Sequence, residues 1–262
     1  MNRVISKDGT AIAYEKLGSG FPLILVDGAL CYRSFGPMPK FASLLSNHFS
    51  VYMYDRRGRG ESTDAAGYSA DREVDDIEAL IAAAGGSAFV FGISSGAALG
   101  LRAVEKKLNI PKLALYEPPF VYTAASGTNP PDHKENLEKI LAAGSRGKAV
   151  KYFMVDMVGV PAAGAFIMQL MPMWKKLKSV AHTLPYDAAV MGDFTVPIAR
   201  IASVTTPTLI AGGGKSSAAL RKAVHLVADA LPNGTLKIME SENHNVAASA
   251  LVPVLTDFFT NK

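Results

Sequence analysis

Short apolar segments alternate with longer segments of helical periodicity along most of the chain. The apolar segments are nearly continuous, which is typical of parallel strands that helices cover on both faces. They lie at residues 21–26, 49–55, 88–93, 112–117, 207–212 and 235–240. The periodic segments predict helices at about 38–46, 69–84, 95–107, 215–231 and 246–260. This order predicts an α/β protein with a doubly wound, mostly parallel sheet, to which a hairpin of residues 3–6 and 11–16 adds antiparallel strands.

One long segment, from Pro118 to about Thr205, has no strand signal. A structureless loop of that length is improbable inside a compact domain, so we expect the segment to form helices. Its pattern predicts them at about 132–144, 147–158, 162–170, 173–181 and 186–193. We therefore divide the chain into a core domain, residues 1–117 and 205–262, and an inserted helical cap, residues 118–204.

Methionine is concentrated in the predicted cap, which holds six of the ten methionines and the single tryptophan of the chain. The flexible, polarizable methionine side chain suits an apolar cavity that adapts to a ligand. We predict that a substrate pocket is lined by Met154, Met157, Met168, Met171, Trp174 and Met191. Ordinary packing between the cap helices is the alternative at each position.

The composition is that of a folded globular protein, because 49% of the residues are hydrophobic and 19% are charged. The net charge of +4 has no dense basic tract behind it, so we expect neither a nucleic acid nor a membrane as a partner. The longest uncharged stretches are interrupted by glycine and proline, which argues against a membrane span. Cys31 is the only cysteine, and the first residues lack the apolar run of a signal peptide. We expect a cytoplasmic protein.

The strongest chemical signal is the motif Gly92-Ile93-Ser94-Ser95-Gly96, which fits the pattern G-x-S-x-G. It follows a predicted buried strand directly and begins a predicted helix. A strand, a sharp turn and a helix in this order expose a serine oxygen at the top of a sheet, and the glycines let the strained turn pack closely. We predict that Ser94 is a nucleophile. A glycine-rich packing turn is the alternative.

Two other segments strengthen a resemblance to the α/β-hydrolase superfamily that covers nearly the whole chain. Residues 26–29, VDGA, occupy the loop where the family usually reads His-Gly, and residues 55–62, DRRGRGES, resemble its D-x-R-G-x-G-x-S loop. The resemblance implies an oxyanion hole formed by the backbone N–H groups of Ala29 and Ser95, with Gly28 as a further candidate. Backbone donors suit this task because they are fixed before negative charge develops.

Asp27 departs from the family pattern, because it stands in place of the family's histidine. That residue braces the loop rather than reacting. We therefore interpret Asp27 as a structural hydrogen-bond acceptor, with a contact to the substrate as the alternative.

The chain contains five histidines that could act as the base. His244 lies between the last predicted strand and the last helix, which is the family's position for the catalytic histidine. His48 and His225 are expected at the surface. His133 and His182 lie in the predicted cap, where we expect structural hydrogen bonds.

The acid that orients this histidine is less obvious. Most family members carry it on the loop after the strand at 207–212, but here that loop reads Gly212-Gly213-Gly214-Lys215. Glu117 ends the strand that follows the nucleophile's helix, and some superfamily members place their acid there. Asp187 and Asp193 in the cap are the alternatives. The Asp-Gly loop, the Ser-Ser-Gly-Ala turn and a glutamate beside proline are also similar to fungal lactone hydrolases that act on zearalenone.

These residues predict a serine hydrolase that cleaves an ester, lactone or related carbonyl bond of a small, largely apolar substrate. Ser94 would attack, His244 would transfer the proton and Glu117 would orient the imidazole. Thioester hydrolysis, carbon–carbon bond hydrolysis and perhydrolysis use the same triad and stay open.

Other functional classes have less support. The chain has no H-E-x-x-H motif, and no G-x-G-x-x-G follows the first buried strand, so we expect no metal and no other cofactor. The alternative from a different class is a small-molecule receptor of the same fold with negligible turnover. The oligomeric state is not predicted.

Overall fold

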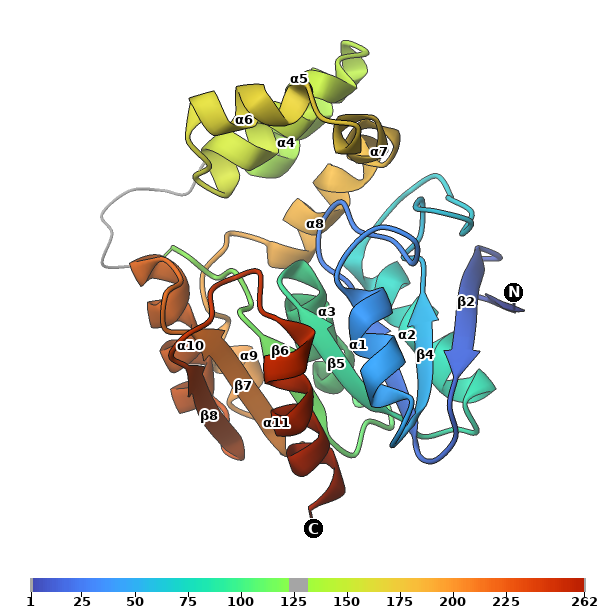
Figure 1. The fold of residues 1–262 in the computed structure, drawn as a ribbon. Helices are drawn as coiled ribbons and strands as arrows, with labels where there is room; N and C mark the ends of the chain where they lie inside the picture. The colour runs from blue at the N-terminus through green and yellow to red at the C-terminus, as the bar shows by residue number, and fades with distance from the viewer. Residues whose placement is uncertain (1, 123–131, 262) are drawn as a thin grey trace.

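The computed structural model contains one eight-stranded sheet with helices on both of its faces (Figure 1). It describes residues 2–122 and 132–261. The strand order is β1-β2-β4-β3-β5-β6-β7-β8. β1 (Asn2–Ile5) and β2 (Ala11–Leu17) form the predicted antiparallel hairpin at one edge, and β2 also pairs antiparallel with β4 (Ser50–Tyr54).

The other strands are parallel, as the continuous apolar runs predict. They are β3 (Pro22–Val26), β5 (Phe89–Ile93), β6 (Leu113–Tyr116), β7 (Thr208–Gly213) and the edge strand β8 (Gly234–Met239). β3 to β7 are buried along nearly their whole length, whereas the edge strand β8 has no buried residue. All six predicted core strands are confirmed, with boundaries that move by at most one residue.

Side chains alternate between two apolar cores because successive residues of a strand point to opposite faces. Leu23 and Leu25 pack in the core that contains α1 (Met38–Leu45) and α11 (Ala248–Thr260). Ile24 and Val26 pack on the other face. The helices of that face are α2 (Ala70–Ala83), α3 (Ser95–Glu105), α9 (Ile198–Ile201) and α10 (Ala218–Ala230).

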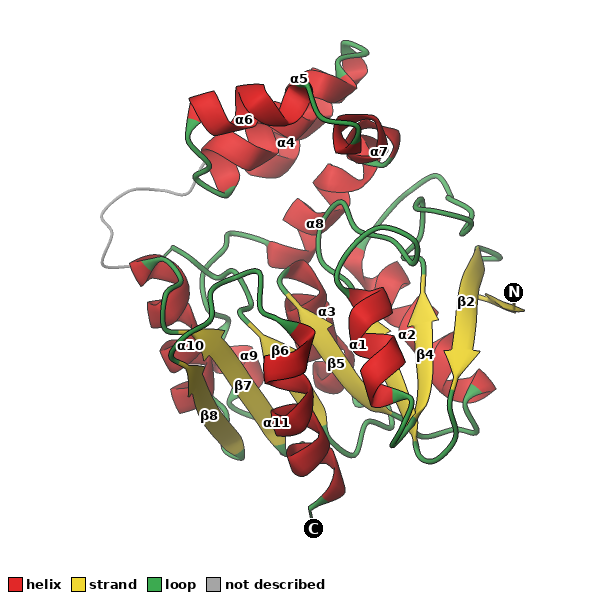
Figure 2. Cartoon of the chain, viewed as in Figure 1, coloured by secondary structure: helices red, strands yellow, loops and turns green. Residues whose placement is uncertain are grey.

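The described part of the long segment between β6 and β7 is mainly helical, as its pattern predicts. Its elements are α4 (His133–Ala142), α5 (Arg146–Tyr152), the π-helical turn η2 (Phe153–Met157), α6 (Ala162–Gln169), α7 (Met173–Ser179), the 3-10 turn η3 (Ala181–Thr183) and α8 (Leu184–Met191). We call α4 to α8 the cap. Figure 2 shows these helices as a group above the sheet, with α8 nearest to it.

The cap shares its apolar core with the sheet. Leu137 of α4, Trp174 of α7 and Leu184 of α8 belong to the same buried cluster as Ile24 and Val26. Because apolar burial is the main favourable contribution to folding, this continuity ties the cap to the apolar core on the side of the sheet that α2 and α3 cover. Within the residues that the structure describes, no helix has the length and apolar composition needed to cross a bilayer.

Candidate active site

Ser94 lies at the turn between β5 and α3, in a strained backbone conformation with φ 56° and ψ −128°. Its neighbours have to be small, since a Cβ atom on Gly92 would lie 2.4 Å from the carbonyl oxygen of Gly96. A Cβ atom on Gly96 would lie 2.2 Å from the carbonyl oxygen of Val26. The motif therefore forms the strand, sharp turn and helix that it predicts, with the strain retained by close packing around it.

Ser94 and Glu117 directly follow two neighbouring strands of the sheet. Ile93 on β5 is paired with Tyr116 on β6, so the residues that follow each of them lie at the same edge of the sheet. The N–H of Ser94 donates to the carbonyl oxygen of Tyr116 at 2.9 Å. Glu117 has a positive φ of 47°, which turns the chain at the end of its strand.

His244 lies in the loop between β8 and α11, and its ring contacts Glu117. The distance from His244 Nδ1 to Glu117 Oε2 is 2.7 Å. The other oxygen, Oε1, accepts a hydrogen bond from the N–H of Gly213 at 2.7 Å. Tyr116 Oη donates to the carbonyl oxygen of Asn243 at 2.6 Å and so holds the histidine loop against β6.

The environment of Glu117 keeps it ionised although it is fully buried. Burial acts to raise the pKa of Glu117, but hydrogen bonds, above all the one from His244, outweigh it and hold the pKa below its ordinary value. A carboxylate can only accept hydrogen bonds, so His244 carries its proton on Nδ1 and leaves Nε2 free as a base. This tautomer is the one that nucleophilic catalysis by serine requires.

Asp187 and Asp193, the alternative acids, have other partners. Asp187 is buried between Arg56 and Arg59, and its Oδ1 is 2.7 Å from Arg56 Nη1. Asp193 is exposed and accepts hydrogen bonds from the N–H and hydroxyl of Thr195 at 2.9 and 2.7 Å. Of the three carboxylates that the sequence offers as candidate triad acids, Glu117 is the one that contacts His244.

The loop after β3 passes close to Ser94. A Cβ atom on Gly28 would lie 3.1 Å from Ser94 Cβ and 3.7 Å from Ser94 Oγ. The N–H of Gly28 donates to Asp27 Oδ1 at 2.9 Å, so this amide already has an acceptor. Ala29 follows in the same loop, and Ser95 begins α3, where the first N–H groups have no acceptor within the helix.

Asp27 is buried and accepts this backbone hydrogen bond, as its structural interpretation predicts. Burial raises the pKa of Asp27 to about 7, against the opposing effects of the Gly28 N–H and the nearby Arg59 and Arg56. Cys31, the only cysteine, lies beside this carboxyl group, and burial raises the pKa of its thiol.

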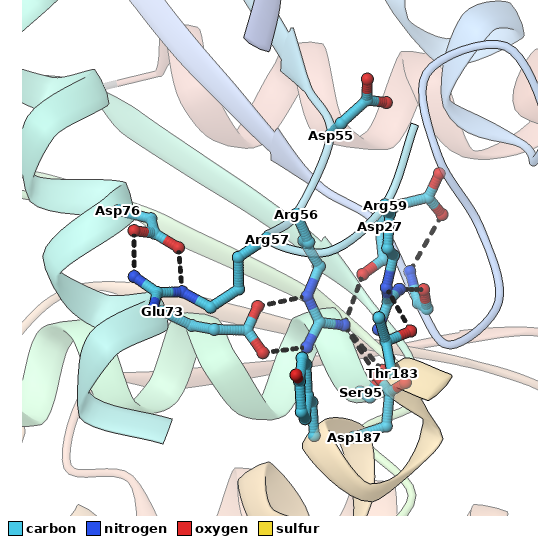
Figure 3. Close-up of polar contacts among 12 residues, drawn as sticks. Asp27, Asp55, Arg56, Arg57, Arg59, Glu73, Asp76, Ser95, Thr183 and Asp187 are labelled. Carbon is cyan, nitrogen blue, oxygen red and sulfur yellow. Dashed lines mark hydrogen bonds and ion pairs between the residues drawn. The ribbon is translucent and has the colours of Figure 1, made fainter. Parts of the chain in front are cut away.

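A buried ionic cluster that contacts Ser95, the residue after Ser94, was not predicted from the sequence (Figure 3). Arg56, Arg57 and Arg59 follow β4 and are each about 1% exposed. Arg56 forms two hydrogen bonds of 2.7 Å with the carboxylate of Glu73 on α2. The three arginines within residues 55–62 were a signal for such a cluster, but their partners are distant in the chain.

The other four histidines lie in different surroundings. His48 and His225 are exposed, as predicted. His133 is buried within the cap, with Nδ1 2.9 Å from Tyr152 Oη. His182 Nε2 is 3.9 Å from a carboxylate oxygen of Asp64.

The predicted pocket residues occupy different environments. Met154, Met157 and Met168 are half-buried against the shared apolar core. Trp174 and Met191 are buried, and Met191 lines a cavity of about 370 Å³ beside α3. Met171 is 47% exposed, which fits a pocket wall least well. In the part of the chain that the structure describes, no group of three or more His, Cys, Asp or Glu side chains is arranged to hold a metal ion.

Comparisons with known proteins show the family of the chain. The model of the alpha/beta hydrolase family matches residues 18–253. The crystal structure of an alpha/beta hydrolase from Sphaerobacter thermophilus DSM 20745 is similar, with 49% sequence identity, a TM-score of 0.92, and coverage of 99% of this chain and 100% of that one.

Two other relatives are more distant or shorter in overlap. The enol-lactonase from Burkholderia xenovorans LB400 has a TM-score of 0.73 at 18% identity, covering 99% of this chain and 100% of that chain, which shows the fold alone. The uncharacterized hydrolase YraK of Bacillus subtilis (strain 168) is 37% identical over 107 residues. That match covers 38% of the length of each protein.

Proposed function

Because the chain belongs to the alpha/beta hydrolase family, we propose that it is a serine hydrolase with the triad Ser94, His244 and Glu117. The observation that carries this proposal is the 2.7 Å contact between His244 Nδ1 and the buried carboxylate of Glu117, at the sheet edge where Ser94 sits in a strained turn. A histidine base oriented by a carboxylate, together with a serine in a strained turn, is the set of groups that nucleophilic catalysis by serine uses.

In the proposed mechanism Ser94 Oγ attacks a carbonyl carbon while His244 Nε2 takes the hydroxyl proton. Glu117 stabilises the imidazolium that forms, because it remains a carboxylate on the far side of the ring. The N–H groups of Ala29 and Ser95 would stabilise the negative charge on the carbonyl oxygen. The Gly28 N–H is left out of this set because Asp27 accepts it. His244 then returns the proton to the leaving group, and water releases the acyl group by the same steps.

The proposed substrate is a small, largely apolar ester or lactone. Its support is the apolar, methionine-rich character of the cap, where Met154, Met157 and Met168 pack against the core without being fully buried. Half-buried methionines can rearrange around ligands of different shape.

Hydrolysis of 4-nitrophenyl esters of increasing chain length and of a lactone panel tests this function, with the Ser94→Ala variant beside the wild type. We expect turnover of at least one substrate, and a loss of roughly 10⁴-fold or more in Ser94→Ala. An organophosphonate probe should add one adduct mass to the wild type and none to this variant.

Two outcomes would refute the proposal. One is labelling that persists in Ser94→Ala, because the reactive group would then lie elsewhere. The other is stoichiometric ligand binding without product or labelling in the wild type, which is the behaviour expected of a receptor.

A further inference from the structure

One carboxylate of the cap contacts two of the buried arginines that follow β4, Arg56 and Arg59. Asp187 on α8 is 2% exposed, and its Oδ1 and Oδ2 lie 2.7 Å from Arg56 Nη1 and Arg59 Nη2, respectively (Figure 3). Burial acts to raise the pKa of Asp187, but the two guanidinium groups outweigh it and keep the pKa below its ordinary value. Asp187 is therefore a buried anion that both arginines share.

The first link runs through Arg59 to the loop after β3. Arg59 Nη1 donates to the carbonyl oxygen of Gly28 at 2.7 Å. This carbonyl belongs to the same planar peptide group as the N–H of Ala29, so the two point in opposite directions. A hydrogen bond to the carbonyl therefore fixes the direction of the Ala29 N–H. It also polarises that N–H, because hydrogen bonds in a chain strengthen one another.

The second link runs from Asp187 to the turn that carries Ser94. Ser95 Oγ donates to Asp187 Oδ1 at 2.7 Å and accepts from Arg56 Nη1 at 3.2 Å. Arg56 Nη1 also lies 3.3 Å from the carbonyl oxygen of Asp27. The side chain of Ser95 is thus held by the same carboxylate that holds Arg59.

We propose that Asp187 is a positioning residue that fixes both backbone donors of the oxyanion hole, the N–H groups of Ala29 and Ser95, and thereby couples the position of cap helix α8 to turnover. This inference rests on the proposed function for its effect on catalysis. The coupling itself is a property of the hydrogen bonds between α8, the loop after β3 and the start of α3.

The chain offers a matched control for the Asp187→Asn variant. Asp76 on α2 is 0% exposed and holds Arg57 through contacts of 2.6 and 2.8 Å. Asp76→Asn therefore also removes one charge from a buried arginine–carboxylate pair. Arg57 keeps the carboxylate of Asp8 and the carbonyl oxygen of Arg72 as partners, and these contacts do not involve the loop after β3 or the start of α3.

The first measurement is steady-state turnover of the best ester or lactone substrate. Loss of a whole oxyanion donor costs roughly 10²- to 10³-fold in kcat. Asp187→Asn retains the donors and misaligns them, so we expect kcat to fall by about 10- to 100-fold with KM within about 3-fold, since these donors act in the transition state. Asp76→Asn should lower the thermal stability about as much as Asp187→Asn lowers it, and it should leave kcat and KM within about 3-fold of the wild-type values.

The second measurement does not depend on activity. In ¹⁵N–¹H spectra, the amide resonances of Ala29 and Ser95 should shift or broaden in Asp187→Asn and stay in place in Asp76→Asn. If Asp187→Asn does not fold, Arg59→Lys tests the same link, because one ammonium group cannot reproduce the fork that reaches both Asp187 and the Gly28 carbonyl.

The outcomes separate the two proposals. Unmoved amide resonances in Asp187→Asn, or equal losses of kcat in Asp187→Asn and Asp76→Asn, overturn the positioning role. Shifted resonances in a protein whose wild type neither turns over substrate nor reacts with the phosphonate probe refute the serine hydrolase but leave the structural coupling standing.

Discussion

Replacing Glu117 by glutamine should abolish most of the activity without unfolding the protein. The substitution keeps the shape of the side chain and removes its charge. In the wild type, Oε1 accepts the N–H of Gly213 at 2.7 Å, and Oε2 faces His244 Nδ1 at the same distance. A glutamine side chain has one oxygen, so it can accept a hydrogen bond at only one of these two positions.

The Gly213 N–H decides which way the glutamine turns. It needs an acceptor, so the amide oxygen of the glutamine takes the place of Oε1 and its NH₂ group faces His244 Nδ1. That NH₂ group donates, which forces the imidazole to carry its proton on Nε2. In this tautomer His244 cannot accept the proton of Ser94. The opposite rotamer leaves the buried N–H of Gly213 without an acceptor and is disfavoured.

We therefore expect kcat to fall by about 10³- to 10⁴-fold in Glu117→Gln, which corresponds to about 4 to 5.5 kcal/mol of transition-state stabilisation. The assay is steady-state ester hydrolysis, with circular dichroism and thermal unfolding to establish that the variant is folded. Asp193→Asn is the control, because Asp193 is exposed and bonded to Thr195, and it should keep kcat within a few-fold. A folded Glu117→Gln variant with kcat within about 10-fold of wild type would refute the reasoning about the tautomer.

Two further predictions concern the cap and the loop after β3. Met168→Ala should change the preference between short and long acyl chains by about 1 to 3 kcal/mol in kcat/KM. Met171→Ala is the control and should leave this preference unchanged, because Met171 is 47% exposed. Equal preferences in the two variants would assign Met168 to ordinary packing. Burial raises the pKa of Asp27 from 3.8 to about 7, so between these pH values the folded protein retains a proton that the unfolded chain has released, and stability falls as the pH rises. In urea unfolding, the free energy of unfolding of Asp27→Asn relative to wild type should rise by up to about 4 kcal/mol between about pH 4 and pH 8. A difference between the two proteins that stays constant across this pH range would contradict the buried, protonated carboxyl group.

The sheet and the helices around it could be predicted because their signals are local. Continuous apolar runs identified the buried strands, and turn residues identified their ends. Boundaries moved where a local contact decides them: the predicted helix at 215–231 begins at Ala218 because the Ser217 side chain accepts the N–H of Leu220. In the cap, the predicted helix at 147–158 ends at Tyr152 and continues as a π-helical turn.

The ionic cluster could not be predicted because its partners are distant in the chain. Arg56 and Asp187 are 131 residues apart in sequence and 2.7 Å apart in the fold. The pattern of the chain showed that Asp187 lies in a helical segment, but it did not show which side of the helix faces the sheet. The sequence therefore leaves Asp187 as an alternative triad acid, whereas in the fold its carboxylate contacts Arg56 and Arg59.

The glycine-rich end of β7 and the acid that follows β6 are in direct contact. A Cβ atom on Gly213 would lie 2.6 Å from the carbonyl oxygen of Glu242, so the histidine loop can pass this close to β7 only where the strand has no side chain. A carboxylate on that strand is thereby excluded at this position by the approach that brings His244 into place. Glu117 reaches the ring from the neighbouring strand instead, and the N–H of Gly213 supplies the hydrogen bond that orients its carboxylate. The sequence has no acid on the loop after β7, and in the fold the acid that contacts His244 directly follows β6.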